Sequence, residues 1–456
     1  MALNNHGSPD GRRAALRPDR RGFLASSLLA VPPAWSATRR DPVCGCAAAF
    51  APQLPPAPGR LKITAVKAFG VTVDKQSDRP YVFVKLETDA GLYGWGEATL
   101  EGKAGAVMTT VGDLEPFLLG QDPMRVEHHW QAMYIHAFYR GGPILGSAIA
   151  GVDQALWDIR GKALGRPVYQ LLGGPLNSRG VRGYYHLRAG GRLGRKASFR
   201  EVLAANRAEA EAHGITAFKT GIAGYYEWIA PARQIREAVA RLETAREVIG
   251  DAIDIGVDFH AKTSPAVAVQ ICKAVEPLKL MFVEEPCPPE NVKAMARIAR
   301  RTTVPIATGE RLVTHYNCRE LVEQKVVDIL QTDINHVGGI TALWKVAAMA
   351  EASGIKMAPH SCEGPIGAIA TLHVDAAMPN FLVQEICSGV EPDAKEKLWE
   401  EWLGFPAMRM VNGYFPLPDK PGLGFDLAEE ALAKYPFRGT VPMPRPTHED
   451  GSIAAW

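Results

Sequence analysis

The stretch that decides the fold is IDIGVDFHAKTS, Ile253 to Ser264. An apolar run typical of a buried strand ends abruptly there in Asp258 and His260. Because side chains two positions apart in a strand point to the same side, both polar groups are expected to face one way at its tip. A single strand that ends in a charge is easily a helix cap or a surface pair. The meaning of this one depends on whether other strands end in the same way.

Eight short apolar segments alternate with amphipathic helical stretches in the second part of the chain. This alternation predicts parallel strands joined by right-handed crossovers. A closed α/β barrel of about 250 residues is the natural architecture. An open doubly wound sheet also alternates, but it does not explain why so many strands end in polar residues. The segments are GVRGYYHL, AFKTG, IDIGVDFH, LKLMFVEEP, VPIATGE, VVDILQTDI, IKMAPH and FLVQEI.

The polar ends of these segments recur about every 25 residues, which is one βα unit. In a barrel, the carboxyl ends of all strands meet at one mouth, where active sites lie. Polar ends that are in phase along so many strands therefore indicate one shared site. In chain order the ends are Lys219, Asp258 with His260, Glu284 with Glu285, Glu310, Asp333, His360 and Glu385.

Three consecutive strands end in the carboxylates Asp258, Glu284 and Glu310, which repel one another unless a cation lies between them. Oxygen ligands with open water positions suit Mg²⁺, with Mn²⁺ as an alternative. Zinc is disfavoured because no His or Cys joins them at ligand spacing. The other interpretation is that each carboxylate pairs separately with Lys or Arg. Glu285 is expected to face away from Glu284 and to have a structural role.

Across the mouth, His360 and Asp333 come from neighbouring strands. A carboxylate bonded to one imidazole nitrogen fixes the tautomer and raises the basicity of the other, so His360 is the candidate general base. His260, beside a metal ligand, is the candidate acid. A metal that holds a substrate carboxylate makes the α-proton removable, and His260 would then protonate a departing β-hydroxyl. Glu385 would hydrogen-bond the enediolate if protonated, or orient the substrate if ionised.

Residues 61–175 have a different pattern. LKITAVKAFGVTV and PYVFVKLETDAGLYGWGEAT are β-rich segments separated by turn residues, which predicts an antiparallel meander. SAIAGVDQALWDIRGKALG follows with one apolar helical face, and Gly165 is expected to end that helix. This part is therefore predicted to be an α+β domain.

Composition narrows the class of protein. A chain of 456 residues suggests two or three domains, at about 150 residues each. The net charge of +2 favours neither nucleic acid nor an anionic membrane as a partner. No run reaches the roughly 20 apolar residues of a spanning helix. The seven cysteines form no zinc motif and are interpreted as reduced core thiols, with Cys287 and Cys362 close in sequence to the candidate site.

Residues 1–60 are rich in Arg, Ala and Pro and contain DRRGFLASSLLAVPPAWSA. Paired arginines, a short apolar stretch and a small-residue site have the order of an export signal of the twin-arginine type. Export would place the protein in the periplasm. The alternative is a disordered extension on a cytoplasmic protein. In either case this leader is excluded from the predicted fold.

The combined motifs resemble the acid-sugar dehydratases of the enolase superfamily, on the mandelate racemase and muconate lactonizing enzyme branch, nearest to the galactonate dehydratases. The resemblance covers about residues 61–456. It implies an N-terminal α+β capping domain over a (β/α)7β barrel, with the barrel in residues 176–400 and a segment 401–456 returning to the cap. The motifs are GWGEAT, FYRGGPILGSAIAGVDQALWDI, GVDFH, FVEEP, ATGER, DINHVGGIT, MAPH, VQE and HEDGSIAAW.

The resemblance implies the same metal ligands, general base and general acid that the polar strand ends indicate. It also implies that cap segments close over a polyol substrate, and it suggests a homo-oligomer that acts on a small acid sugar. The residues assigned to substrate binding are Glu385, Lys219, Arg79, Tyr139, Arg140 and His186.

The chain departs from the family pattern at two places. Racemases of this branch carry a second base two residues past the first lysine, where this chain has Gly221. Without that base, dehydration of an aldonate such as galactonate to a 2-keto-3-deoxy acid is favoured over racemisation. Tyr184, His186 and Arg188 replace a family segment and suggest another substrate. A racemase, epimerase or cycloisomerase is the first alternative function, and a non-catalytic sugar-acid binding protein is the second.

Overall fold

The structure of the chain is a computed structural model that describes residues 61–74, 79–188, 197–387, 394–406 and 409–455. The predicted leader, residues 1–60, lies outside the described residues. Within the described part of the chain, none of the helices has both the length and the apolar character needed to cross a bilayer.

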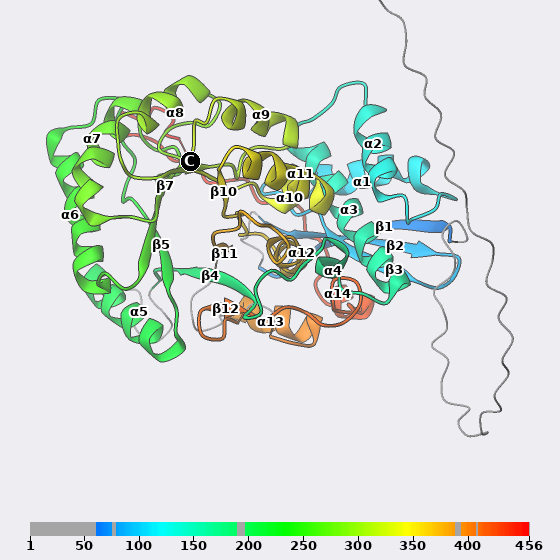
Figure 1. Cartoon of the computed structure of the whole chain (residues 1–456). Helices are drawn as coiled ribbons and strands as arrows, with labels where there is room; N and C mark the ends of the chain where they lie inside the picture. The colour runs from blue at the N-terminus through cyan, green and yellow to red at the C-terminus, as the bar shows by residue number, and fades with distance from the viewer. Residues whose placement is uncertain (1–60, 75–78, 189–196, 388–393, 407–408, 456) are drawn as a thin grey trace, which may run out of the picture. The chain divides into compact units, whose positions relative to one another are not determined.

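The amino-terminal part begins with an antiparallel sheet that packs on one long helix (Figure 1). Gly94 and Gly96 make this close packing feasible. A Cβ on Gly96 would lie 2.0 Å from the carbonyl oxygen of Gly151, and one on Gly94 would lie 2.1 Å from that of Ala155. Only a residue without a side chain permits such an approach between strand and helix. The strands are β1 (Ile63–Val71), β2 (Tyr81–Thr88) and β3 (Tyr93–Glu97), and the helices are α1 (Ala104–Leu118), α2 (Val126–Ile135), α3 (Pro143–Leu164) and α4 (Val168–Leu171).

Helix α3 ends where the sequence predicts. Gly165 takes a left-handed conformation with φ of 63°, and its N–H donates to the Lys162 carbonyl. Glycine adopts this conformation without a steric penalty, which makes it a common residue at the end of a helix.

The eight predicted strands form a parallel sheet in the order β10-β9-β8-β7-β6-β5-β4-β11. The sheet closes on itself through a parallel bridge between Met357 and Phe381. The fold is therefore the predicted barrel of parallel strands. The strands are β4 (Val181–His186), β5 (Ala217–Gly221), β6 (Asp254–Asp258), β7 (Phe282–Glu284), β8 (Ile306–Thr308), β9 (Ile329–Leu330), β10 (Lys356–Met357) and β11 (Gln384–Ile386), with β12 (Tyr414–Phe415) antiparallel to β4.

Helices follow the first seven barrel strands, which gives the predicted (β/α)7β order. Because neighbouring strands are parallel, their carboxyl ends lie at the same end of the barrel. The helices are α5 (Phe199–His213), α6 (Ala232–Ile249), α7 (Pro265–Val275), α8 (Val292–Ala299), α9 (His315–Glu323), α10 (Ile334–Val337), α11 (Gly339–Ala352) and α12 (Pro365–Asp375), and α13 (Ala394–Leu403) and α14 (Glu429–Ala433) come after β11.

The inside of the barrel is a small, separate apolar core. Large and small side chains share it, since Phe282 occupies the space that the missing side chain of Gly256 leaves on the neighbouring strand. A Cβ on Gly256 would lie 2.6 Å from the Phe282 ring. This filling keeps polar chemistry at the mouth and out of the lumen. The core consists of Tyr184, Ala217, Phe282, Ala307, Ile329, Ala358 and Val383.

The carboxyl-terminal segment packs against the amino-terminal part. Val71 forms a bridge with Pro436, and the Val168 N–H donates to the Gly422 carbonyl. The ammonium of Lys85 lies 2.5 Å from a carboxylate oxygen of Glu429. These contacts agree with the return to the cap that the resemblance implies, whereas the exact domain boundaries stay predictions.

Candidate active site

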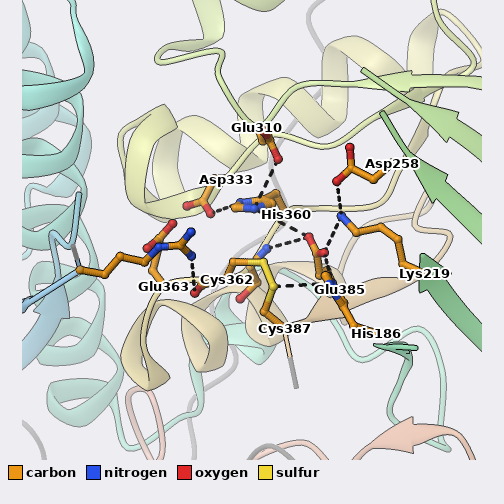
Figure 2. Close-up of a disulfide and its surroundings, with 12 residues drawn as sticks. His186, Lys219, Asp258, Glu310, Asp333, His360, Cys362, Glu363, Glu385 and Cys387 are labelled. Atoms are coloured by element: carbon orange, nitrogen blue, oxygen red, sulfur yellow. Dashed lines mark hydrogen bonds and ion pairs between the residues drawn. A yellow bond between two sulfur atoms is a disulfide. The ribbon is translucent and has the colours of Figure 1, made fainter. Parts of the chain in front are cut away.

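The polar residues predicted from the strand ends lie together at the carboxyl-terminal mouth of the barrel. Figure 2 labels all of them except Glu284 and shows the labelled side chains pointing toward one another. Some lie inside a strand, and others follow one by two or three residues, so each side chain is carried by a separate βα unit. The group consists of His186, Lys219, Asp258, Glu284, Glu310, Asp333, His360 and Glu385.

Lys219 holds the centre of this group. Its ammonium lies 2.6 Å from Glu385, 3.0 Å from Glu284 and 3.3 Å from Asp258. Burial lowers the pKa of Lys219, but the charges of Glu284 and Glu385 outweigh burial and hold it well above the usual range. The carboxylates around Lys219 therefore stabilise its charged ammonium form.

The three predicted metal ligands share this region. Asp258 and Glu284 lie opposite each other on adjacent strands and contact the same ammonium. Asp258 and Glu310, with His260, place ligand atoms within 4.8 Å of one another. Burial and the charge of Asp258 raise the pKa of Glu284 to about 8. This crowding of buried oxygen donors fits a hard divalent cation such as Mg²⁺, which would relieve the repulsion.

Two residues outside the sequence prediction support these carboxylates. The side-chain amide of Gln331 donates to Glu284 over 2.8 Å. The guanidinium of Arg311 pairs with the buried Glu285, which therefore has a structural contact as expected. Gln331 lies two residues before Asp333, which the sequence pattern marks as the polar end of that strand. The same pattern gives no separate signal for Gln331.

His260 contacts Asp258, but not by the strand geometry that the sequence suggested. Strand β6 ends at Asp258, and His260 lies beyond it with a φ of 48° in the left-handed region. That turn brings its Nε2 within 3.0 Å of Asp258, while its backbone N–H donates to the same carboxylate over 2.7 Å. The side chain stays 43% exposed, so it faces the open side of the mouth.

His360 and Asp333 form the predicted dyad. Nδ1 of His360 lies 2.6 Å from Oδ2 of Asp333, whose other oxygen accepts from the Asn335 N–H. Nε2 of His360 faces Glu310 at 3.4 Å and Glu385 at 4.0 Å. Burial lowers the pKa of His360, but the charge of Glu385 and the bond to Asp333 raise it well above the usual value. The carboxylates around the ring thus stabilise its imidazolium form, which is the product of proton abstraction.

The sequence left open whether Glu385 is protonated or ionised, and its contacts favour the ionised form. Its Oε1 lies 2.7 Å from Nε2 of His186 as well as beside Lys219. Burial raises the pKa of Glu385, but Lys219 and His360 hold it well below the usual range. Burial lowers the pKa of His186. An ionised Glu385 accepts hydrogen bonds, so it is suited to orienting hydroxyl groups.

The prediction of reduced thiols is wrong for two cysteines. Cys362 and Cys387 form a disulfide beside Glu385 and His186 (Figure 2). The fold brings them together because the segments after β10 and β11 are neighbours at the mouth. Cys272, Cys287 and Cys318 are free and buried, as predicted. The remaining two cysteines of the chain lie outside the described residues.

A cavity of about 120 Å³ lies beyond Glu385, between the mouth and the cap. Arg79, a predicted substrate residue, lines it, pairs with Glu101 at 2.7 Å and approaches the Cys362 carbonyl. Arg188 also lines it, and in the described part of the chain no carboxylate pairs with its guanidinium. The other lining residues are Ser361, Cys362, Glu363, Gly364, Ala368, Ile386, Cys387, Lys395, Glu396 and Trp399.

A second group of charged residues lies beside this cavity and was missed by the sequence reasoning. His336 lies 3.6 Å from the buried carboxylate of Glu363. Burial lowers the pKa of His336, but Asp333 and Glu363 raise it to about 9, while His336 and Arg79 bring the pKa of Glu363 to about 2 against its burial. Glu363 and the imidazole of His336 therefore form an ion pair next to the dyad.

Tyr139 and Arg140 lie between α2 and α3 and are exposed, with Tyr139 90% accessible. Neither belongs to the residues that line the cavity. Their role in binding substrate stays a prediction.

Two family models match the chain. The mandelate racemase / muconate lactonizing enzyme N-terminal domain matches residues 61–173, and the enolase C-terminal domain-like family matches residues 201–431. The chain belongs to the enolase superfamily. The predicted resemblance is thereby confirmed.

Relatives of known activity agree with this membership. The D-galactonate dehydratase of Ralstonia pickettii (strain 12J) is 41% identical over 82% of this chain and 96% of its own length. That of Pectobacterium atrosepticum is 38% identical over the same shares of both chains. This similarity makes the chain a dehydratase, which is a carbon–oxygen lyase, and confirms the predicted enzyme class.

Solved structures of the superfamily have the same fold. A mandelate racemase/muconate lactonizing enzyme-like protein from Rubrobacter xylanophilus has a TM-score of 0.73 at 32% identity, over 83% of this chain and 98% of its own. An enolase from Agrobacterium radiobacter, with sodium and L-malate bound, has a TM-score of 0.76 at 28% identity, over 87% of this chain and all of its own.

Proposed function

We propose that the chain dehydrates a sugar acid, an aldonate such as galactonate or a relative, to a 2-keto-3-deoxy acid with the help of Mg²⁺. The observation that carries the proposal is the His360–Asp333 dyad, in which Nε2 of His360 faces Glu310 and Glu385. His260 lies in the same mouth, beside Asp258. The relatives named above are D-galactonate dehydratases, and their sequences align with this chain over most of both lengths.

Asp258, Glu284 and Glu310 would hold the divalent ion, with Mn²⁺ as the alternative to Mg²⁺. When bound, the ion supplies positive charge beside the substrate carboxylate, which lowers the energy of the negative charge that develops on proton removal. Lys219 remains beside Asp258 and Glu284 as a second fixed positive charge in the same region.

His360 removes the proton from the carbon next to the substrate carboxylate. Asp333 accepts a hydrogen bond from Nδ1–H of His360 over 2.6 Å. In the neutral ring the lone pair is therefore on Nε2, which points away from Asp333 into the mouth. After proton transfer, Asp333 stabilises the imidazolium. Proton transfer by a positioned base contributes about 10² to 10⁴ in rate.

His260 donates a proton to the β-hydroxyl as the carbon–oxygen bond breaks, and water leaves. Its bond to Asp258 orients the ring. Glu385, ionised and held by His186 and Lys219, accepts hydrogen bonds from substrate hydroxyls and so fixes the stereochemistry that the site accepts.

Dehydration is favoured over racemisation because the opposite face of the substrate has no base. Lys219 is a fixed cation among three carboxylates, and Gly221 offers no side chain. The chain carries each of the predicted carboxylates and histidines, which supports an enzyme over a non-catalytic binding protein.

A screen of a stereochemically complete acid-sugar library with Mg²⁺ tests the proposal. A new α-keto acid, detected with semicarbazide, is the expected product. Exchange of the C2 proton in D₂O without loss of hydroxyl would instead favour an epimerase or racemase. Tight binding of a library member without turnover would favour a binding protein.

We also propose export to the periplasm. The consecutive arginines of the leader support it, and so does the disulfide, because disulfides persist mainly in oxidising compartments. A homo-oligomer in solution stays a prediction of the resemblance. Fractionation of cells that express the full chain, followed by mass measurement of the native protein, tests both.

A further inference from the structure

Each cysteine of the disulfide lies two residues after a residue of the proposed active site. Cys362 follows the base His360 by two residues, and Cys387 follows Glu385 by two residues. Their Cα atoms lie 4.8 Å apart, so the bond ties the segment after β10 to the end of β11 (Figure 2). Both sulfur-bearing residues also line the cavity beside the mouth.

The bond lies at the seam where the barrel closes. Other neighbouring strands of the barrel share two or more register pairs. Among the residues that the structure describes, β10 meets the segment leading into β11 through the single bridge of Met357 and Phe381. Two hydrogen bonds cross the seam nearer the mouth, from the Gln384 amide to the Pro359 carbonyl and from the Ser361 N–H to Glu385. The second of these is long, at 3.4 Å.

His360 and Glu385 therefore lie between one backbone bridge and one covalent bond. Their side chains approach to 4.0 Å across the seam. If the seam opened at the mouth, the separation between the base and the residue that orients the substrate would change. A displacement of about 1 Å in such a pair costs roughly 10²-fold in rate.

We propose that the Cys362–Cys387 disulfide positions His360 relative to Glu385, and that the oxidised chain is the fully active form. This rests on the dehydration proposed above. The disulfide is a positioning element because neither sulfur touches the reacting atoms. It differs from a general stabiliser in that its loss changes turnover while the barrel remains folded.

The interconversion needs only a dithiol. A reducing dithiol gives two electrons and two protons to the bond, which breaks into the thiols of Cys362 and Cys387, while the reductant closes to its own disulfide. Both cysteines are half-buried at the cavity, so a small dithiol can reach them. In the described part of the chain, the three free cysteines are buried and fall outside this exchange.

The test compares oxidised and dithiothreitol-reduced full-length protein, with saturating Mg²⁺ and the best substrate of the library screen. Mass spectrometry after alkylation reports the state of Cys362 and Cys387. We expect reduction to lower kcat at least tenfold with less than threefold change in KM, and to raise the primary isotope effect of C2-deuterated substrate. Reoxidation should restore kcat. The Cys362→Ser/Cys387→Ser variant should match the reduced protein and ignore dithiothreitol.

Cys318→Ala, which removes a buried thiol on α9, is the matched control and should respond to dithiothreitol as the parent does. Circular dichroism below the melting temperature monitors folding. Equal kcat and equal isotope effects in the two states, with alkylation complete, would overturn the inference and leave the proposed function intact. An oxidised protein without activity on any library member would instead remove the proposed function. Loss of helical signal on reduction, in parallel with activity, would assign the bond to stability and overturn the positioning role.

Discussion

Asp333→Asn is the substitution that most directly tests the proposed base. Asp333 makes two short bonds, to Nδ1 of His360 and to the Asn335 N–H, each 2.6 Å long. An asparagine keeps the second bond through its carbonyl oxygen, since a donor amide cannot accept from a backbone N–H. Its NH₂ group must then face Nδ1. The imidazole is forced to carry its proton on Nε2, the atom that has to receive the substrate proton.

The expected loss follows from that change of tautomer. A base without an available lone pair forfeits its contribution, and the corresponding substitution in a catalytic triad lowers kcat by about 10⁴-fold. Because His360 here also loses the negative charge that stabilises its imidazolium, we expect a fall of about 10³ to 10⁴ in kcat, or about 4 to 5.5 kcal/mol in the activation barrier. KM should change little, since the carboxylate ligands and Glu385 are intact.

Steady-state assay of keto-acid formation measures kcat and KM. Asp254→Asn is the control and should keep wild-type kcat. It makes the same change of side chain at the far end of β6, where Asp254 pairs with Arg182 at 2.7 Å. A kcat for Asp333→Asn within tenfold of wild type would refute the role of the dyad. A D₂O experiment adds a second readout, because deuterium incorporation at C3 of the 2-keto-3-deoxy product should be lost together with dehydration.

Three further outcomes are expected. Gly256→Ala should destabilise the fold by about 1–3 kcal/mol in urea unfolding, because its Cβ would lie 2.6 Å from the Phe282 ring, and an unchanged midpoint would contradict the interior packing. Burial lowers the pKa of His373 to about 4 in the folded chain. Below about pH 6.5 the unfolded chain therefore binds a proton at this imidazole that the folded chain does not bind, and the free energy of unfolding falls. Its contribution is complete above pH 6.5, and about 3 kcal/mol is lost as the pH falls to about 4, a slope that His373→Asn should flatten in denaturant titrations. Removal of divalent ions with EDTA should abolish keto-acid formation and added Mg²⁺ should restore it, whereas activity that survives EDTA would rule out the metal role of Asp258.

The strand ends were predictable because they depend on local pattern. Each barrel strand is a short apolar run, and a polar residue at its end must emerge at the mouth if the strands are parallel. The helix end at Gly165 was predictable for the same kind of reason, since one residue type suits one backbone conformation. The barrel and most of its site therefore follow from signals within single βα units.

The rest depends on contacts between units. Cys362 and Cys387 are 25 residues apart, and their pairing appears only when β10 and β11 close the barrel. The ion pair of His336 and Glu363 likewise depends on how helix α10 meets the segment between β10 and α12. The position of His260 was missed in detail because a left-handed turn, and not continued strand geometry, brings it to Asp258.

The ammonium of Lys219 affects whether the barrel needs its proposed metal ion in order to fold. It acts as a built-in counter-ion that already compensates much of the acidic charge beneath the mouth before any inorganic ion arrives. We therefore expect the barrel to reach its native form without the proposed ion and to bind that ion afterwards.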